Sequence, residues 1–333
     1  MLSRTSKHTN VIYITDDTLS YLTLSTSPRG FFISAHDTVE LPMGTIKSGE
    51  ILRADLFTKI LKKLSRHLNG THVDILLPHE YFLCTDAVLE TSSKKQSLRK
   101  RVQKYLDTSG RNLSWRSTHV CECNPYPTLH HDRVLFTGLP KHIHSMYTHC
   151  AREARLTIDS FNSDLLAFAH LLEGNRVSVV NVTRNTIRVA EFDHGMYVNH
   201  KTFEASYQGL VTDIQDMLNV STAEAHTILQ KYGVLRAHKD ERVYKKLLRS
   251  LSPLIEFLTK RKIKRDASVT VIFTYKPLLG FVDLLKSRIR SDIRECDIVY
   301  TDHATFQDVL TIHRSDVYAY QPLIAQALKR HIG

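Results

Sequence analysis

The feature that most constrains the fold is a turn-rich run at residues 40–51, followed by a helical pattern and an apolar strand pattern. Its two glycines, Gly44 and Gly49, can take positive φ without steric cost, so each can turn the chain sharply. Apolar periodicity then predicts an amphipathic helix over residues 55–68 and a buried strand over residues 73–77. The stripe of that helix comprises Leu52, Leu56, Ile60, Leu61, Leu64 and Leu68. The expected fold class is therefore α/β.

A pattern of three short strands occurs twice in the chain. The first copy covers residues 11–15, 19–24 and 31–35, and the second covers residues 177–182, 186–192 and 196–203. Turn residues such as Asp16-Asp17 and His194-Gly195 separate the strands. An internal repeat of this kind predicts two halves that are built alike, and 333 residues suffice for two such halves.

Composition narrows the class of protein. Apolar residues make up 42% of the chain and charged residues 24%, as in ordinary soluble globular proteins. The sequence contains no run of about 18 apolar residues, so we expect no membrane-spanning helix. The polar N-terminus lacks the apolar core of a signal peptide, and five cysteines are an odd and sparse set. These features favour a cytoplasmic protein.

The formal net charge is +11, and basic residues cluster at residues 94–104 and 260–265. Such clusters can bind nucleic acid or an anionic membrane surface, or can form an ordinary solvated face. No aromatic residues are interleaved with the basic ones, and no nucleic-acid motif is present. Direct binding of DNA or RNA is therefore the minor hypothesis for these clusters.

Two stretches carry a family resemblance. The run Leu-Pro-x-Gly-x-Ile-x-x-Gly-Glu-Ile from Leu41 to Ile51, ahead of a helix and a strand, resembles the PilM family of type IV pilus assembly proteins. These are actin-like relatives of the division protein FtsA. The Ser-Thr-Ala-Glu-Ala-His spacing from Ser221, with a capping box to Glu224 and a stop at Gly233, resembles the helix in the second lobe of that family.

The resemblance implies an actin-like fold of two ribonuclease-H-like halves with an inserted small α+β subdomain of the SHS2 or 1C type. The first lobe would comprise residues 10–72, 151–174 and 316–331. The inserted subdomain would comprise residues 73–150. The second lobe would comprise residues 175–315, with a helical part at about 206–265 that includes a helix containing Pro253, where we expect a kink or two helices.

Actin-like folds hold ATP with two hairpins that typically contain Asp and Gly, and with a Gly-Gly pair near adenine. The first matching stretch here, Asp16-Asp17-Thr18, keeps a carboxylate but has no glycine. In the second, Asn181 replaces the acid and Thr183 the glycine, and residues 274–277 contain no glycine pair. We therefore expect Asp16, Thr18, Asn181 and Thr183 to be vestigial nucleotide-loop positions in a pseudo-ATPase without a cofactor. Arg184 or Lys276 could still attract an anion, so binding of Mg-ATP stays open as an alternative.

Two further sets of residues contain side chains that metal sites or nucleophilic sites use. Cys121 and Cys123, with His130 and His131 nearby, do not have the Cys-x₂₋₄-Cys spacing of structural zinc sites, and their alternation indicates a half-buried strand. We expect no metal. The neighbours His149 and Cys150 do not form a nucleophile pair, because adjacent residues of a helix point in different directions.

Three hypotheses about function follow. The preferred one is a non-catalytic actin-like scaffold, peripheral on the inner membrane, that belongs to a type IV pilus-like assembly platform. The resemblance implies that it binds the cytoplasmic tail of a PilN-like membrane partner between the first lobe and the inserted subdomain. Contact with anionic lipid and self-association are further expectations of this hypothesis. The alternatives are an ATP-binding actin-like protein of pilus assembly or cell division, and a basic adaptor that binds nucleic acid.

Overall fold

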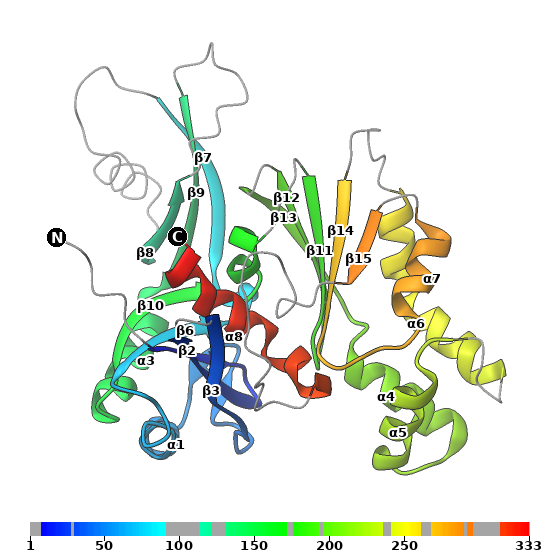
Figure 1. Ribbon diagram of the computed structural model, residues 1–333, viewed down its shortest axis with the longest axis horizontal. Helices are drawn as coiled ribbons and strands as arrows, with labels where there is room; N and C mark the ends of the chain where they lie inside the picture. Colours follow the sequence, from blue (N-terminus) through cyan, green and yellow to red (C-terminus); the bar gives the residue numbers. More distant parts are fainter. Residues whose placement is uncertain are drawn as a thin grey trace. The chain divides into compact units, whose positions relative to one another are not determined.

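The computed structural model describes ten segments of the chain (Figure 1): residues 8–27, 30–90, 113–120, 131–171, 176–193, 196–235, 241–260, 268–289, 292–295 and 314–332. The chain divides into two compact units. Unit 1 comprises Met1–Phe168, Ala304–Thr311 and Pro322–Gly333, and unit 2 comprises Ala169–His303 and Ile312–Gln321. No helix in these segments is long and apolar enough to cross a membrane.

The main sheet of unit 1 has five strands in the order β10-β6-β1-β2-β3. Strands β1 (His8–Ile14), β2 (Thr18–Ser27) and β3 (Gly30–Glu40) form an antiparallel meander, and β6 (His72–Leu77) and β10 (Thr157–Ser163) add in parallel. The expected meander is confirmed. Its strands are longer than the apolar alternation indicated, because hydroxyl groups also pair across them, as Ser20 and Thr38 do at 2.8 Å.

Residues 73–77 form a strand as expected, but this strand does not open an inserted subdomain. β6 lies between β10 and β1, so it is part of the main sheet. The insertion has its own antiparallel sheet, β7-β9-β8, made of β7 (Leu83–Glu90), β8 (Leu113–Val120) and β9 (His131–Pro140). A short 3-10 helix, η1 (His79–Tyr81), leads into it. The basic residues 94–104 lie outside the described residues.

Two helices cover the core of unit 1. Helix α1 (Ala54–Leu64) buries Phe57, Leu61 and Leu64, and the edge of Tyr147 from α3 (Lys141–Glu153) meets the Phe57 ring at 5.7 Å. The predicted stripe was wrong at its start. Leu52 is 56% exposed and precedes the helix, because its backbone N–H donates to the Thr45 carbonyl, 2.9 Å away, which holds it in the preceding loop. Helix α3 contacts α1, so it belongs to the main body and not to the insertion.

Unit 2 repeats the topology of the main sheet of unit 1. Its order is β13-β12-β11-β14-β15, where β11 (Arg176–Val182), β12 (Ile187–Asp193) and β13 (Met196–Phe203) form the meander. Strands β14 (Ser268–Thr274) and β15 (Asp292–Glu295) add in parallel. This confirms the internal duplication.

The helices of unit 2 follow the sequence signals closely. They are α4 (Tyr207–Leu218), α5 (Thr222–Tyr232), α6 (Glu241–Lys260) and α7 (Phe281–Arg288). The Ser221–Glu224 capping box opens α5, and Gly233 ends it with a φ of 56°. The segment around Pro253 forms one helix and not two, and α6 packs Val243, Leu247, Leu251, Leu254 and Leu258 into the core. The 3-10 helix η2 (Leu166–Leu171) precedes these helices in the chain and spans the boundary between the two units.

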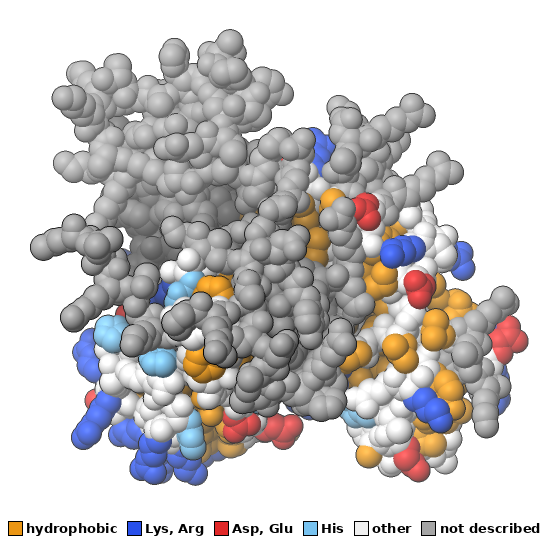
Figure 2. All heavy atoms as spheres, in the orientation of Figure 1, with side chains coloured by type: hydrophobic (Ala, Val, Ile, Leu, Met, Phe, Trp, Pro, Cys, Tyr) orange, Lys and Arg blue, Asp and Glu red, His pale blue; other side chains and the backbone are white. Residues whose placement is uncertain are grey.

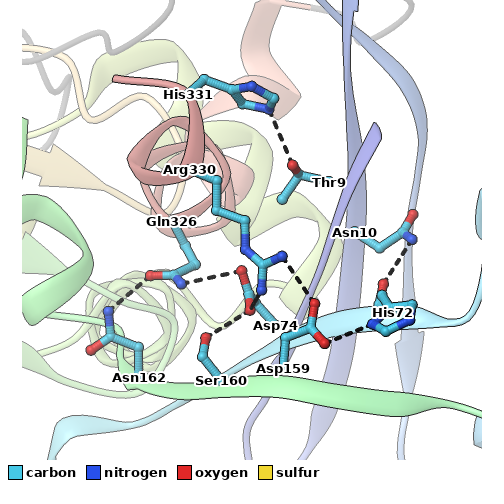
Figure 3. A network of polar contacts seen from close by, with 10 residues as sticks. All are labelled: Thr9, Asn10, His72, Asp74, Asp159, Ser160, Asn162, Gln326, Arg330 and His331. Carbon is cyan, nitrogen blue, oxygen red and sulfur yellow. Dashed lines mark hydrogen bonds and ion pairs between the residues drawn. The ribbon is translucent and has the colours of Figure 1, made fainter. Parts of the chain in front are cut away.

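The last part of helix α8 (Arg314–Ile332) is fastened to the main sheet of unit 1 by a polar network (Figure 3). Arg330 binds two carboxylates, Asp74 of β6 at 2.5 Å and Asp159 of β10 at 2.9 Å. Gln326 accepts a hydrogen bond from the side chain of Asn162 at 2.8 Å. Burial works to raise the pKa of Asp159, but the hydrogen bonds from His72 and Arg330 outweigh burial, so this pKa lies below its ordinary value.

Candidate functional site

The β1–β2 hairpin, where the first phosphate loop of an actin-type site would lie, is closed by a pair of threonines. The Thr15 N–H donates to the Thr18 carbonyl at 2.9 Å, and the two hydroxyl oxygens lie 2.9 Å apart. The Thr15 hydroxyl also accepts hydrogen bonds from the backbone N–H groups of Asp17 and Thr18, at 3.3 and 3.0 Å. These two amides are therefore already bound by a side chain of the hairpin itself.

Asp16 lies at the tip of this hairpin, and both of its carboxylate oxygens are occupied by protein donors. It accepts hydrogen bonds from the backbone N–H groups of Ser48 at 2.7 Å and Gly49 at 3.1 Å, and from the Tyr81 hydroxyl at 2.6 Å. Ser48 and Gly49 both have positive φ, 51° and 81°. Successive N–H groups in such a conformation form a concave anion site, which is here filled by Asp16.

This arrangement explains the turn-rich run of the sequence. The short hairpin of β4 (Ile46–Lys47) and β5 (Glu50–Ile51) presents its turn to Asp16. A Cβ at Gly49 would lie 2.7 Å from the Tyr81 ring, so only glycine fits between that ring and the carboxylate. Burial and the hydrogen bond to Asp16 raise the pKa of the Tyr81 hydroxyl well above its ordinary value. The hydroxyl therefore stays protonated and donates to Asp16.

The β11–β12 hairpin of unit 2 is closed in the same way. The Thr183 N–H donates to the Thr186 carbonyl at 2.8 Å, the Thr186 N–H donates to the Thr183 hydroxyl at 3.0 Å, and the two hydroxyls lie 3.0 Å apart. Both hairpins thus contain Thr-x-x-Thr at corresponding positions, Thr15 with Thr18 and Thr183 with Thr186. Sequence reasoning missed this repeat, although the spacing was visible.

Aromatic and cationic side chains surround the second hairpin. Tyr207, the first residue of α4, donates its backbone N–H to the Thr183 carbonyl at 3.2 Å. Its ring stacks on His226 at 5.8 Å and meets the edge of Tyr275, also at 5.8 Å. Burial and the nearby cations Lys276 and Arg184 lower the pKa of His226. Burial raises the pKa of Tyr207 to about 12. Arg184 and Lys276 thus lie close enough to His226 to disfavour its protonated form.

Four buried polar side-chain atoms near this hairpin have no hydrogen-bond partner within the described segments. They are Asn181 Nδ2, Thr274 Oγ1, Tyr207 Oη and His226 Nδ1. Asn181 and Thr274 lie at the carboxyl ends of the parallel strands β11 and β14. Buried polar groups in native proteins nearly always have a protein or water partner, so these four atoms are available to hydrogen-bond water or a small ligand.

The other weighed residues do not assemble into a site. No group of three or more metal-ligating side chains occurs among the residues that the structure describes, and Cys121, Cys123 and His130 lie outside them. Cys150 is buried under α1, whereas His149 is largely exposed, so the two do not form a pair. Burial raises the pKa of the Cys150 thiol, which disfavours the nucleophilic thiolate.

No protein-family model and no curated protein sequence matches the chain. Solved structures do match it. A structure of the PilM-PilN type IV pilus biogenesis complex matches with a TM-score of 0.73 and 13% identity, over 99% of both chains. The ADP-bound MreB5 of Spiroplasma citri matches with a TM-score of 0.51 and 9% identity, over 97% of this chain and 99% of that chain.

These likenesses, together with the duplicated sheets, establish the fold. The chain has the actin-like α/β fold of two ribonuclease-H-like halves, as the resemblance implied, with the small β7-β9-β8 sheet inserted in the first half. At such low identities the structures show the fold and not the activity.

Proposed function

We propose that this chain is a non-catalytic actin-like scaffold of a type IV pilus-like assembly platform, cytoplasmic and peripheral on the inner membrane. It binds the cytoplasmic tail of a PilN-like membrane partner. The observation that carries the proposal is the likeness to PilM, which extends over 99% of both chains and therefore includes the inserted sheet. That PilM structure was solved as a complex with PilN.

The two hairpins support a role without ATP hydrolysis. In an actin-type site, glycine-containing hairpins direct backbone amides at the phosphates, and acidic residues orient magnesium through water. Here Thr15 and Thr183 each accept a backbone N–H of their own hairpin, and the Asp16 carboxylate is held by three protein donors. Opening the Asp16 site to a metal would break these charge-assisted hydrogen bonds, each of which contributes about 1.5–3 kcal/mol.

We place the partner tail where the inserted sheet meets the main sheet of unit 1. Strand β10 is an edge of the main sheet, β8 is an edge of the inserted sheet, and the two strands contact each other. Within the described segments neither strand has a second strand partner. An edge strand presents unpaired N–H and C=O groups that an extended peptide can bind, with no catalytic residue required.

This placement is tested by hydrogen exchange with a soluble peptide that copies the cytoplasmic tail of a one-span membrane protein encoded beside this chain. We expect the amides of β8 and β10 to gain protection when the peptide binds. The amides of β3, the opposite edge of the same main sheet, serve as the internal control and should not change. Binding with protection confined to other strands would contradict the placement, and absence of binding would contradict the proposed function.

A second candidate function is the binding of an anion or nucleotide by unit 2 without hydrolysis. The four unpartnered polar atoms beside the β11–β12 hairpin favour it, as do the cations Arg184 and Lys276. Calorimetric titration with Mg-ATP at low salt tests it. The scaffold proposal predicts no saturable heat up to millimolar nucleotide. A saturable heat that the substitution Lys276→Ala weakens at least tenfold would establish the second candidate instead.

A further inference from the structure

The outer face of helix α1 is strongly cationic. Lys59, Lys62 and Lys63 lie on one face of the helix, opposite its buried side chains, and Arg66 follows in the turn just after the helix ends. All four side chains are exposed. Asp55 is the one acidic residue of the helix itself. In Figure 2, blue side chains gather at the lower left, where Figure 1 draws α1.

The cations of α1 differ from those of another basic helix, α6. On α6, Lys245 pairs with Glu241 at 3.2 Å, Lys246 pairs with Asp213 at 3.3 Å, and Lys260 pairs with Glu256. None of these four cations has an ion pair with any residue that the structure describes. Within the described part of the chain their charge is therefore available to an external anionic surface.

Two large apolar side chains project into solvent where α1 begins. Met43 is 98% exposed and Leu52 is 56% exposed. Both belong to one loop, because the Thr45 hydroxyl donates to the Pro42 carbonyl at 2.6 Å and the Thr45 carbonyl accepts the Leu52 N–H at 2.9 Å. The loop continues into the Ser48-Gly49 turn that binds Asp16. These hydrogen bonds fix the backbone of the loop that carries Met43 and Leu52.

Cations together with exposed aliphatic side chains match the chemistry of an anionic lipid surface. Lipid phosphates attract lysine and arginine, and the boundary between headgroups and acyl chains accepts apolar side chains a few ångströms below the surface. Nucleic acid would use the cations but has no comparable use for Met43 and Leu52, because its contacts with apolar surface are chiefly to stacking aromatic residues. Charge and apolar exposure together therefore favour the membrane.

We propose that the outer face of α1, with Met43 and Leu52 beside it, binds anionic membrane directly. This surface, the α1 surface, does not include the basic residues 94–104, which lie outside the described residues. It also needs no partner tail, so it extends the proposed function beyond capture of a membrane protein. The α1 surface would hold the first unit against the bilayer even before a tail binds.

The electrostatic part is tested by co-sedimentation of the full chain with vesicles of phosphatidylcholine containing phosphatidylglycerol. Each cation near such a surface contributes about fivefold to binding, so Lys59→Glu with Lys63→Glu should weaken it at least about 25-fold. The matched control is Lys245→Glu with Arg249→Glu, two exposed cations at the same spacing on α6, which should change it little. Vesicles of phosphatidylcholine alone should not bind the native chain.

The apolar part is tested separately with Met43→Ser and Leu52→Ser. Both side chains are exposed, so thermal unfolding should be unchanged, whereas vesicle binding should fall by about tenfold when both are replaced. Equal vesicle binding by the charge-reversed variant and its α6 control would overturn the proposal. A second pair of results would also overturn it. In that case the Lys59→Glu, Lys63→Glu variant loses binding to duplex DNA, and the Met43 and Leu52 substitutions leave vesicle binding unchanged. Tail binding, measured in solution without lipid, reports on the proposed function independently.

Discussion

Arg330→Met is expected to lower the free energy of unfolding of unit 1 by about 3 kcal/mol. Asp74 lies in the middle of the main sheet and is only 1% exposed, and its charge is compensated by the Arg330 guanidinium at 2.5 Å. Methionine keeps most of the aliphatic length of the side chain but removes the guanidinium that pairs with this buried carboxylate, which leaves the Lys329 ammonium as the nearby cation. Ser160, which donates to Asp74 at 2.7 Å, reduces the loss without removing it. Urea unfolding followed by circular dichroism measures the change.

A surface ion pair provides the matched control. Arg176 and Asp193 are 3.8 Å apart, with side chains 59% and 32% exposed, so Arg176→Met should cost less than about 1 kcal/mol. The double variant Arg330→Met, Asp74→Asn should recover much of the stability, because residue 74 then carries no buried charge that needs a cation. Equal effects of the two arginine substitutions would show that Asp74 does not depend on Arg330.

Gly233→Ala is expected to destabilise unit 2 by at least about 3 kcal/mol. Gly233 ends α5 with a φ of 56°, and an added Cβ would lie 2.1 Å from the carbonyl oxygen of Leu279. That oxygen cannot easily move away, since it accepts the Val234 N–H at 2.9 Å. The substitution therefore adds a backbone clash to the ordinary strain of a left-handed residue. Thermal and urea unfolding of the purified variant measure the loss.

Gly44→Ala separates the two contributions. Gly44 has a φ of 75°, but nothing lies within 4 Å of a Cβ placed there. Alanine at this position should cost only the left-handed strain, roughly 1–2 kcal/mol. If both glycine substitutions cost the same, the close approach of Leu279 to Gly233 contributes nothing and the prediction for Gly233 is wrong.

Local signals in the sequence predicted local structure well. Ser221, Glu224 and Gly233 fixed both ends of α5, because capping depends on residues within one turn of the helix end. The repeated meander likewise predicted two similar halves. The Thr-x-x-Thr closures were equally local, since each joins residues three apart. They were missed because the two hairpins were compared with a nucleotide-binding pattern and not with each other.

Non-local contacts could not be predicted in the same way. The apolar run at residues 73–77 predicted a strand but did not identify its neighbours. The strand was therefore expected in the inserted subdomain, whereas it lies between β10 and β1 in the main sheet. Asp16 looked like a turn residue or a lost magnesium ligand, and its partners Ser48 and Gly49 lie 32 and 33 residues away. The charge of Asp74 within an apolar strand indicated that a partner was needed, but nothing in the sequence identified Arg330 as that partner.

The polar network that fastens α8 also bears on the order of folding during synthesis. Asp74 and Arg330 are separated by 256 residues, and Asn162 and Gln326 by 164. Domains usually fold from the N-terminus as the chain leaves the ribosome, at about 5–20 residues per second. The main sheet of unit 1 must therefore wait some tens of seconds, with the whole of unit 2 made in between, before its buried carboxylate meets its cation. During that interval Asp74 lacks the guanidinium that pairs with it in the folded protein.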